Sequence, residues 1–139
     1  MIPLYAQDHD YSKYNVLAVD DIPLNLLLVQ KMLSRFNFKM RTAANGQQAL
    51  DAVEVLKPDL ILLDLMMPGI DGFEVIRRLR STPETADIQI VILSALNSNE
   101  DIVKVFNEGA NDFIMKPIIM EKLLSCVVTQ MQVVEAKSK

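Results

Sequence analysis

Short runs of apolar residues alternate along the chain with longer segments in which apolar residues recur every three or four positions. Several of the short runs are rich in β-branched residues and lack polar alternation, which indicates strands buried on both faces of a sheet. The longer segments have the period of helices that cover such a sheet. The strands are expected at 14–19, 39–43, 60–63, 88–93 and 112–115, and the helices at 23–36, 46–56, 73–80, 99–107 and from 119 past 131.

Proline and glycine residues support these boundaries. Pro23 suits a helix start through its fixed φ, Pro58 ends the second helix, and Gly109 is typical of a helix stop. Five strands then alternate strictly with five helices, and right-handed crossovers leave few topologies. The sequence predicts an α/β fold with a doubly wound, five-stranded parallel sheet of order 2-1-3-4-5.

The length of 139 residues fits one domain, expected at 14–132 with tails at 1–13 and 133–139. The formal net charge of −4 argues against nucleic acid as a direct partner. No apolar run approaches the roughly 18 residues that cross a bilayer, and no signal peptide is recognisable, so the cytoplasm is the expected location. The single cysteine, Cys126, excludes an internal disulfide, and its apolar neighbours indicate an inert core thiol.

Polar residues follow four of the expected strands. Asp20 and Asp21 come after the first strand, Asp64 after the third, Ser94 after the fourth and Lys116 after the fifth. The carboxyl ends of parallel strands meet at one edge of a sheet. The first and third strands are neighbours where the winding reverses, and ligands bind in the crevice at such a point.

The chemistry of these side chains suggests phosphoryl transfer. Three carboxylates at close range repel one another unless a cation joins them, and oxygen ligands with open positions favour Mg²⁺, with Mn²⁺ as an alternative. A carboxylate can be the nucleophile that forms an aspartyl phosphate, and a serine hydroxyl and a lysine ammonium can bind the transferred group. The only histidine, His9, is expected in solvent, so general-base catalysis by histidine is not expected.

Each of these residues also has a purely structural interpretation when it is taken alone. Asp20-Asp21 could cap the following helix, Asp64 could be a turn residue, and Lys116 could be a solvated surface lysine. Ser94 could cap the next helix, although residues 98–99 are better placed. Because all these interpretations would have to hold together at four strand ends, we favour the functional site.

Longer stretches around these residues resemble the receiver domains of response regulators in two-component signalling, with the same order and spacing over residues 14–132. The resemblance implies a CheY-like, flavodoxin-like three-layer fold and a phosphorelay, in which a histidine kinase or a histidine phosphotransfer protein donates a phosphoryl group to Asp64. The matching stretches are Val19-Asp20-Asp21, Pro58 to Glu74, Leu93-Ser94-Ala95, Gly109 to Phe113, and Lys116-Pro117.

The resemblance also implies a role for each acidic residue. Asp21, Asp64 and the backbone carbonyl of Met66 are the expected direct Mg²⁺ ligands, and Asp20 is expected to act through a metal-bound water. Met66 and Leu96 flank the path of attacking water in the family. Two apolar side chains there do not orient water, so we expect a phosphoacceptor switch with slow self-dephosphorylation and no further enzymatic turnover.

The remaining implied roles concern the bound phosphoryl group and its signal. Ser94 is the expected switch hydroxyl, and Lys116, which precedes an expected cis bond to Pro117, pairs with the phosphoryl group. Phe113 occupies the position of a rotating aromatic that is often tyrosine, and it could equally be a plain core ring. The face formed by the fourth helix, fifth strand and fifth helix is where the family often dimerises.

Three other functions share parts of this pattern. A phosphohydrolase of the haloacid-dehalogenase kind needs a second aspartate two residues after the nucleophile, where this chain has Met66. A flavodoxin-like electron carrier needs a hydroxyl-rich phosphate loop after the first strand, where this chain has Asp20-Asp21. A pseudo-receiver that serves only as a scaffold is disfavoured because all five site residues are present. Whether the receiver stands alone or belongs to a longer regulator or hybrid kinase stays open.

Overall fold

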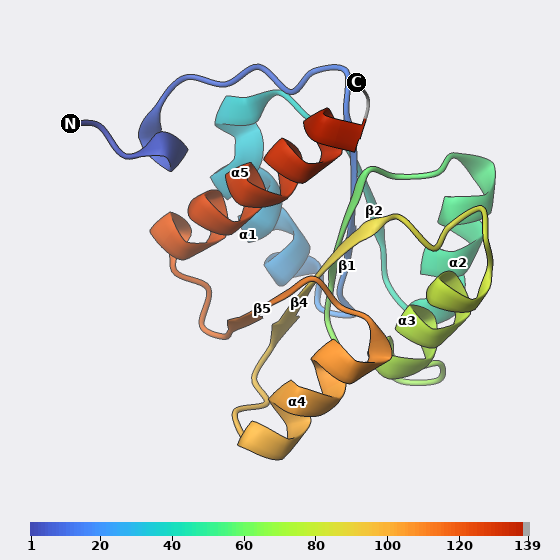
Figure 1. Cartoon of the computed structure of the whole chain (residues 1–139). Helices are drawn as coiled ribbons and strands as arrows, with labels where there is room; N and C mark the ends of the chain where they lie inside the picture. Colours follow the sequence, from blue (N-terminus) through green and yellow to red (C-terminus); the bar gives the residue numbers. More distant parts are fainter. Residues whose placement is uncertain (138–139) are drawn as a thin grey trace.

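A computed structural model describes residues 1–137 of the chain. Within these residues, five strands form one sheet in the order β2-β1-β3-β4-β5, and all neighbouring strands are parallel (Figure 1). The strands are β1 (Asn15–Val19), β2 (Lys39–Ala43), β3 (Leu60–Leu63), β4 (Gln89–Ser94) and β5 (Asp112–Met115). The helices are α1 (Pro23–Leu33), α2 (Gly46–Val55), α3 (Gly72–Ser81), α4 (Asn99–Glu108) and α5 (Met120–Lys137), with short 3₁₀ helices η1 (Leu4–Ala6) and η2 (Ser34–Phe36).

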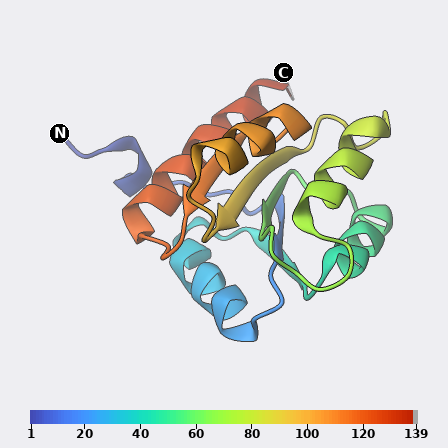
Figure 2. The same ribbon diagram turned by 90° about the horizontal axis from the view of Figure 1, so that it is seen from below.

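The sheet lies between two layers of helices, as the absence of polar alternation in its strands predicts. Helices α1 and α5 cover one face, and α2, α3 and α4 cover the other (Figures 1 and 2). The central strand β3 is buried at every position, and its side chains alternate between the two cores. Leu60 and Leu62 face the α1–α5 layer, whereas Ile61 and Leu63 face the other layer. Cys126 is buried in the α1–α5 core, as expected.

Side-chain caps fix the starts of three helices that follow the carboxyl edge. Asn45, Asp71 and Ser98 each accept a hydrogen bond from a backbone N–H in the first turn of α2, α3 and α4. Helix α1 starts differently, because its N-cap is Ile22 and proline occupies the first helical position. Because no side chain caps the start of α1, the Asp20 carboxylate is not needed as its cap.

The predicted fold, strand order and cis bond between Lys116 and Pro117 are confirmed, and two boundaries differ by more than about one residue. The expected helix 23–36 stops being α-helical at Leu33 and ends in the turn η2, because Asn37 takes a left-handed conformation with φ of 63°. The expected tail 133–139 is largely helical, since α5 continues to Lys137. Residues 138–139 of that tail lie outside the described residues.

The segment before β1 packs against the domain. Tyr11 is 3% exposed within the α1–α5 core, and its backbone N–H donates to the carbonyl of Phe36 at 2.8 Å. The His9 ring stacks on Tyr11 with a centroid distance of 5.3 Å, and its Nε2 lies 2.9 Å from the carbonyl of Leu4. The expectation of a fully solvated His9 was therefore wrong, because aromatic packing holds this residue half-buried.

Candidate functional site

Three carboxylates meet at the carboxyl edge of the sheet. Asp20 and Asp21 follow β1, and Asp64 follows β3, the adjacent strand. One oxygen from each carboxylate lies within 4.8 Å of the others. Asp20 and Asp64 are buried and Asp21 is exposed, so the cluster reaches solvent at Asp21. The sequence prediction that these strand ends converge is thus met in the structure.

Both oxygens of the buried Asp20 carboxylate accept hydrogen bonds. Oδ1 accepts from the backbone N–H of Ile22 at 2.9 Å. Oδ2 accepts from Nζ of Lys116 at 3.0 Å and from Nδ2 of Asn25 at 3.1 Å. Lys116 follows β5, two strands beyond β3, so its long side chain crosses the edge of the sheet to reach the acidic cluster.

The surroundings of Asp64 disfavour a negative charge on its carboxylate. Burial raises the pKa of its carboxyl, Lys116 opposes this rise, and Asp20 and Asp21 add to it. Its Oδ2 lies 3.8 Å from Nζ of Lys116, and its Oδ1 accepts from the N–H of Met66 at 3.3 Å. The ammonium is thus closer to Asp20 than to Asp64.

The other predicted site residues surround this cluster at different depths. Ser94, the last residue of β4, is completely buried, and its Oγ accepts from the N–H of Leu96 at 3.2 Å. The Met66 side chain is 62% exposed and Leu96 is half-buried. Phe113 packs against the core beneath α2, α3 and α4 and stays partly buried. Ser98 caps α4, so Ser94 is free of that structural role.

Asn25 is the contact of the site that the sequence analysis missed. It lies in the first turn of α1, five residues after Asp20, and its neutral amide carries no charge that would mark it as a partner of Asp20. The signal available in the sequence was its position: a residue in the first turn after the Asp20-Asp21 pair can reach back to the strand end.

The donor set of the acidic cluster fits a divalent cation. It offers only oxygen atoms, and the like charges of Asp20 and Asp21 already raise the pKa of Asp64. A hard cation with oxygen ligands relieves that repulsion. The acidic triad is therefore consistent with a divalent metal site.

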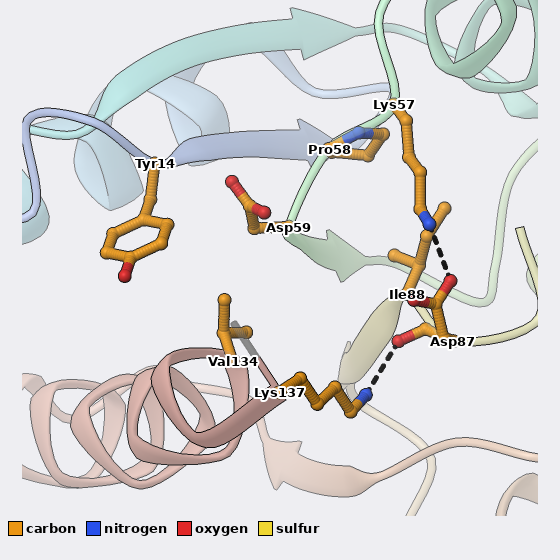
Figure 3. Close-up of a pocket in the computed structure, with 8 residues that line it drawn as sticks. All are labelled: Tyr14, Lys57, Pro58, Asp59, Asp87, Ile88, Val134 and Lys137. Atoms are coloured by element: carbon orange, nitrogen blue, oxygen red, sulfur yellow. Dashed lines mark hydrogen bonds and ion pairs between the residues drawn. The ribbon is translucent and has the colours of Figure 1, made fainter. Parts of the chain in front are cut away.

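A pocket of about 250 Å³ lies at the opposite, amino edge of the sheet (Figure 3). Both of its lysines are already engaged, since Lys57 pairs with the Asp87 carboxylate at 2.6 Å and Lys137 donates to the Asp87 carbonyl at 2.9 Å. The concentrated charge is at the carboxyl edge, and we place the functional site there. Over residues 1–137, no helix is both long and apolar enough to cross a membrane.

Comparison with known proteins agrees with this fold and site. The family described as response regulator receiver domain matches residues 16–128. Response regulator PleD from Caulobacter vibrioides is 42% identical over 103 residues, which are 74% of this chain and 23% of PleD. A signal receiver domain of a histidine kinase from Syntrophus aciditrophicus is 30% identical, with a TM-score of 0.81 over 87% of this chain and 92% of that domain. The chemotaxis protein CheY4 from Vibrio cholerae is 29% identical, with a TM-score of 0.78 over 84% of this chain and 97% of CheY4.

The chain thus spans about a quarter of the length of PleD, whereas it covers nearly all of the two solved structures. The matched region contains the five strands except for Asn15 at the start of β1, together with the acidic triad and Lys116. On the match over residues 16–128, the shared fold and the acidic pocket, the chain belongs to the family of response-regulator receiver domains.

Proposed function

We propose that this receiver domain accepts a phosphoryl group from a phosphohistidine partner onto Asp64, in a Mg²⁺-dependent reaction, and changes conformation to signal. The observation that carries the proposal is the meeting of three carboxylates with the Lys116 ammonium at one edge of the sheet. Receiver domains partner histidine kinases, and the donor is either such a kinase or a histidine phosphotransfer protein. The cytoplasm remains the expected location.

The metal site is proposed at Asp21, Asp64 and the backbone carbonyl of Met66, with Asp20 acting through a water. Mn²⁺ would fit the same oxygen ligands. When bound there, the ion supplies positive charge that offsets the carboxylates and the incoming phosphoryl oxygens. The exposed position of Asp21 supports this assignment, since it leaves the acidic cluster open to solvent.

Asp64 is the proposed nucleophile. One of its carboxylate oxygens forms an O–P bond while the P–N bond of the phosphohistidine breaks, and the released imidazole takes up a proton from solvent. Lys116 lies 3.8 Å from Asp64, close to where the phosphoryl oxygens would form. Its ammonium and the Ser94 hydroxyl are the proposed ligands of those oxygens.

The signal is proposed to leave through the face formed by α4, β5 and α5. Ser94, at the end of β4, would turn toward the phosphoryl group, and Phe113, on β5 of this face, would rotate with it. Val103, Phe106 and Met115 are exposed on the same face and suit a homodimer. No enzymatic turnover beyond self-phosphorylation and slow self-dephosphorylation is proposed.

Acetyl phosphate with Mg²⁺ tests the proposal. Intact mass spectrometry of the full chain should show one added phosphoryl group. No such group should be added when EDTA is present during the reaction, or in Asp64→Ala. Asp51→Ala is the matched control, because Asp51 is an exposed aspartate on α2, away from the acidic triad. Equal labelling of Asp64→Ala would contradict the proposal, absence of labelling in the unchanged chain would favour a scaffold, and sustained release of phosphate from simple esters would favour a phosphohydrolase.

A further inference from the structure

The Oδ2 atom of Asp20 accepts two hydrogen bonds from different parts of the chain. Lys116, after β5, donates a charged bond at 3.0 Å, and Asn25, in α1, donates a neutral bond at 3.1 Å. Asp20 is only 6% exposed, so bulk water has little access to this oxygen in the metal-free protein. The hydrogen bonding of this buried oxygen therefore depends on both Lys116 and Asn25.

This inference rests on the proposed function. In that function Lys116 has to serve two partners, the Asp20 carboxylate and the phosphoryl group on Asp64. Its ammonium is 3.0 Å from Asp20 but 3.8 Å from Asp64, the proposed site of the phosphoryl group. A closer bond to phosphoryl oxygens on Asp64 would draw the ammonium away from Asp20. A buried carboxylate oxygen that loses its only donor carries the full desolvation cost of that group, and this cost would oppose the shift.

We propose that Asn25 is a positioning residue that keeps Asp20 hydrogen-bonded when Lys116 turns to the phosphoryl group. Asn25 is held in the first turn of α1, where its own N–H donates to the Ile22 carbonyl at 3.0 Å. Its amide can therefore remain on Oδ2 while the lysine leaves. Ile22 keeps Oδ1 in place through a separate bond at 2.9 Å.

The surroundings explain why a side-chain amide is needed at this position. Asp20, Asn25 and Lys116 line one end of a groove of about 200 Å³ between α1 and the β5–α5 connection. The other side chains that line the groove are apolar and offer no alternative side-chain donor. The apolar walls are formed by Leu28, Val29, Met32, Leu93, Pro117 and Ile118. A neutral donor also adds no positive charge beside the proposed metal ligands, whereas a lysine or arginine would.

Beryllofluoride, a phosphoryl mimic, tests the inference on the full chain at saturating Mg²⁺. Isothermal titration calorimetry should show that Asn25→Ala weakens beryllofluoride binding about tenfold, the value expected when a buried charged group loses a hydrogen bond. Asn25→Leu, which keeps the volume without the donor, should behave in the same way. Asn25→Gln restores an amide and should recover much of the affinity. Gln30→Ala, an amide removal elsewhere on α1, should leave the affinity within about twofold.

The affinity for Mg²⁺ alone separates this role from simple support of the site. Without beryllofluoride, Lys116 still holds Asp20, so Mg²⁺ affinity in Asn25→Ala should stay within about twofold of the unchanged chain. The inference is overturned if Mg²⁺ affinity falls as much as beryllofluoride affinity, or if beryllofluoride affinity does not fall. Failure of the unchanged chain to bind beryllofluoride would instead overturn the proposed function itself.

Discussion

Among single residues, Asp64 carries the largest electrostatic conflict of the site. Burial raises the pKa of its carboxyl, Lys116 partly offsets this rise, and Asp20 and Asp21 increase it. In metal-free protein at neutral pH, the ionised carboxylate therefore costs stability. Asp64→Asn removes the charge at constant shape, and we expect it to raise the free energy of unfolding by about 1 kcal/mol, a usual size for single substitutions.

The pH dependence gives this prediction its sign. Because the pKa of Asp64 is higher in the folded chain than in the unfolded chain, the folded chain keeps the proton to higher pH, and stability falls as pH rises through that interval. The increase in the free energy of unfolding in Asp64→Asn should be absent below a pH of about 3.9, the pKa of an aspartate in the unfolded chain. It should grow with rising pH as the Asp64 carboxyl of the folded chain ionises. Urea unfolding in EDTA measures it, with Asp71→Asn as control, since asparagine caps α3 as well as aspartate does. A gain that does not change with pH would contradict the prediction.

We expect Met66 and Leu96 to determine how long the proposed phosphoryl group lasts. Met66, two residues after Asp64, is 62% exposed, and Leu96 lies two residues after Ser94, so we expect both to flank the approach to the acceptor with apolar groups. We expect Met66→Asn combined with Leu96→Glu to release phosphate at least about tenfold faster, because polar side chains there can orient the attacking water. Phosphate release after labelling with acetyl phosphate measures the rate. Val55→Asn, an exposed apolar position on α2, should not change it, and an equal rate in the double variant would refute the idea.

At the scale of elements, Arg80 ties helix α3 to the amino edge of the sheet. Its guanidinium donates to the carbonyls of Gly109, Ala86 and Ile88 and to Oδ1 of Asn111, at 2.6 to 2.9 Å. These acceptors precede β4 and β5, so one side chain joins three elements.

Arg80→Met should therefore lower the free energy of unfolding by about 2–3 kcal/mol, because it leaves partly buried acceptors without a donor. Arg78→Met is the matched control on the same helix. Arg78 is exposed and pairs with Glu74 at i,i+4, a contact that contributes about 0.5 kcal/mol or less. Urea unfolding of both variants measures the difference, and equal losses would show that Arg80 has no special role.

The strands and helices were predictable because each carries its own local signal. The four apolar residues of β3, short and bounded by Pro58 and Asp64, indicate a buried strand between layers. Asn45 and Ser98 mark helix starts by side-chain hydrogen bonds that act within one turn. The end of α1 was misplaced because the helical period continues to Phe36 while the turn depends on the left-handed Asn37.

The acidic cluster was predictable for a topological reason, since parallel strands bring Asp20 and Asp64 to one edge. The hydrogen-bond partners within the acidic cluster were not predictable from the sequence. The distance of Lys116 from each carboxylate depends on the path of a long side chain across two strands. Asn25 was missed for the same reason: its contact with Asp20 follows from the angle at which α1 leaves the sheet, which no residue pattern specifies.

At the scale of the whole molecule, the packed domain extends further toward the N-terminus than the expected boundary at residue 14. Tyr11 lies in the α1–α5 core, with its ring 5.1 Å from Phe38 and 5.5 Å from Phe36. Helix η1 packs against α5, and Tyr11 packs on Phe36 of η2, so the N-terminal segment joins α5 to the turn that ends α1. Tyrosines and a histidine near the start of a chain resemble a polar tail in composition, and only the tertiary contacts reveal their burial.

We therefore expect Tyr11→Ala to lower the free energy of unfolding by about 3 kcal/mol, the cost of removing a buried aromatic ring. Two shortened chains separate this ring from the rest of the segment. Residues 10–139 keep Tyr11 and should lose only the contacts of η1 and His9, whereas residues 14–139 should lose at least as much stability as Tyr11→Ala. Urea unfolding of the three chains beside the full one measures the differences. If residues 10–139 and 14–139 unfolded at the same urea concentration, Tyr11 would contribute nothing and the domain would begin at residue 14 as the sequence pattern suggests.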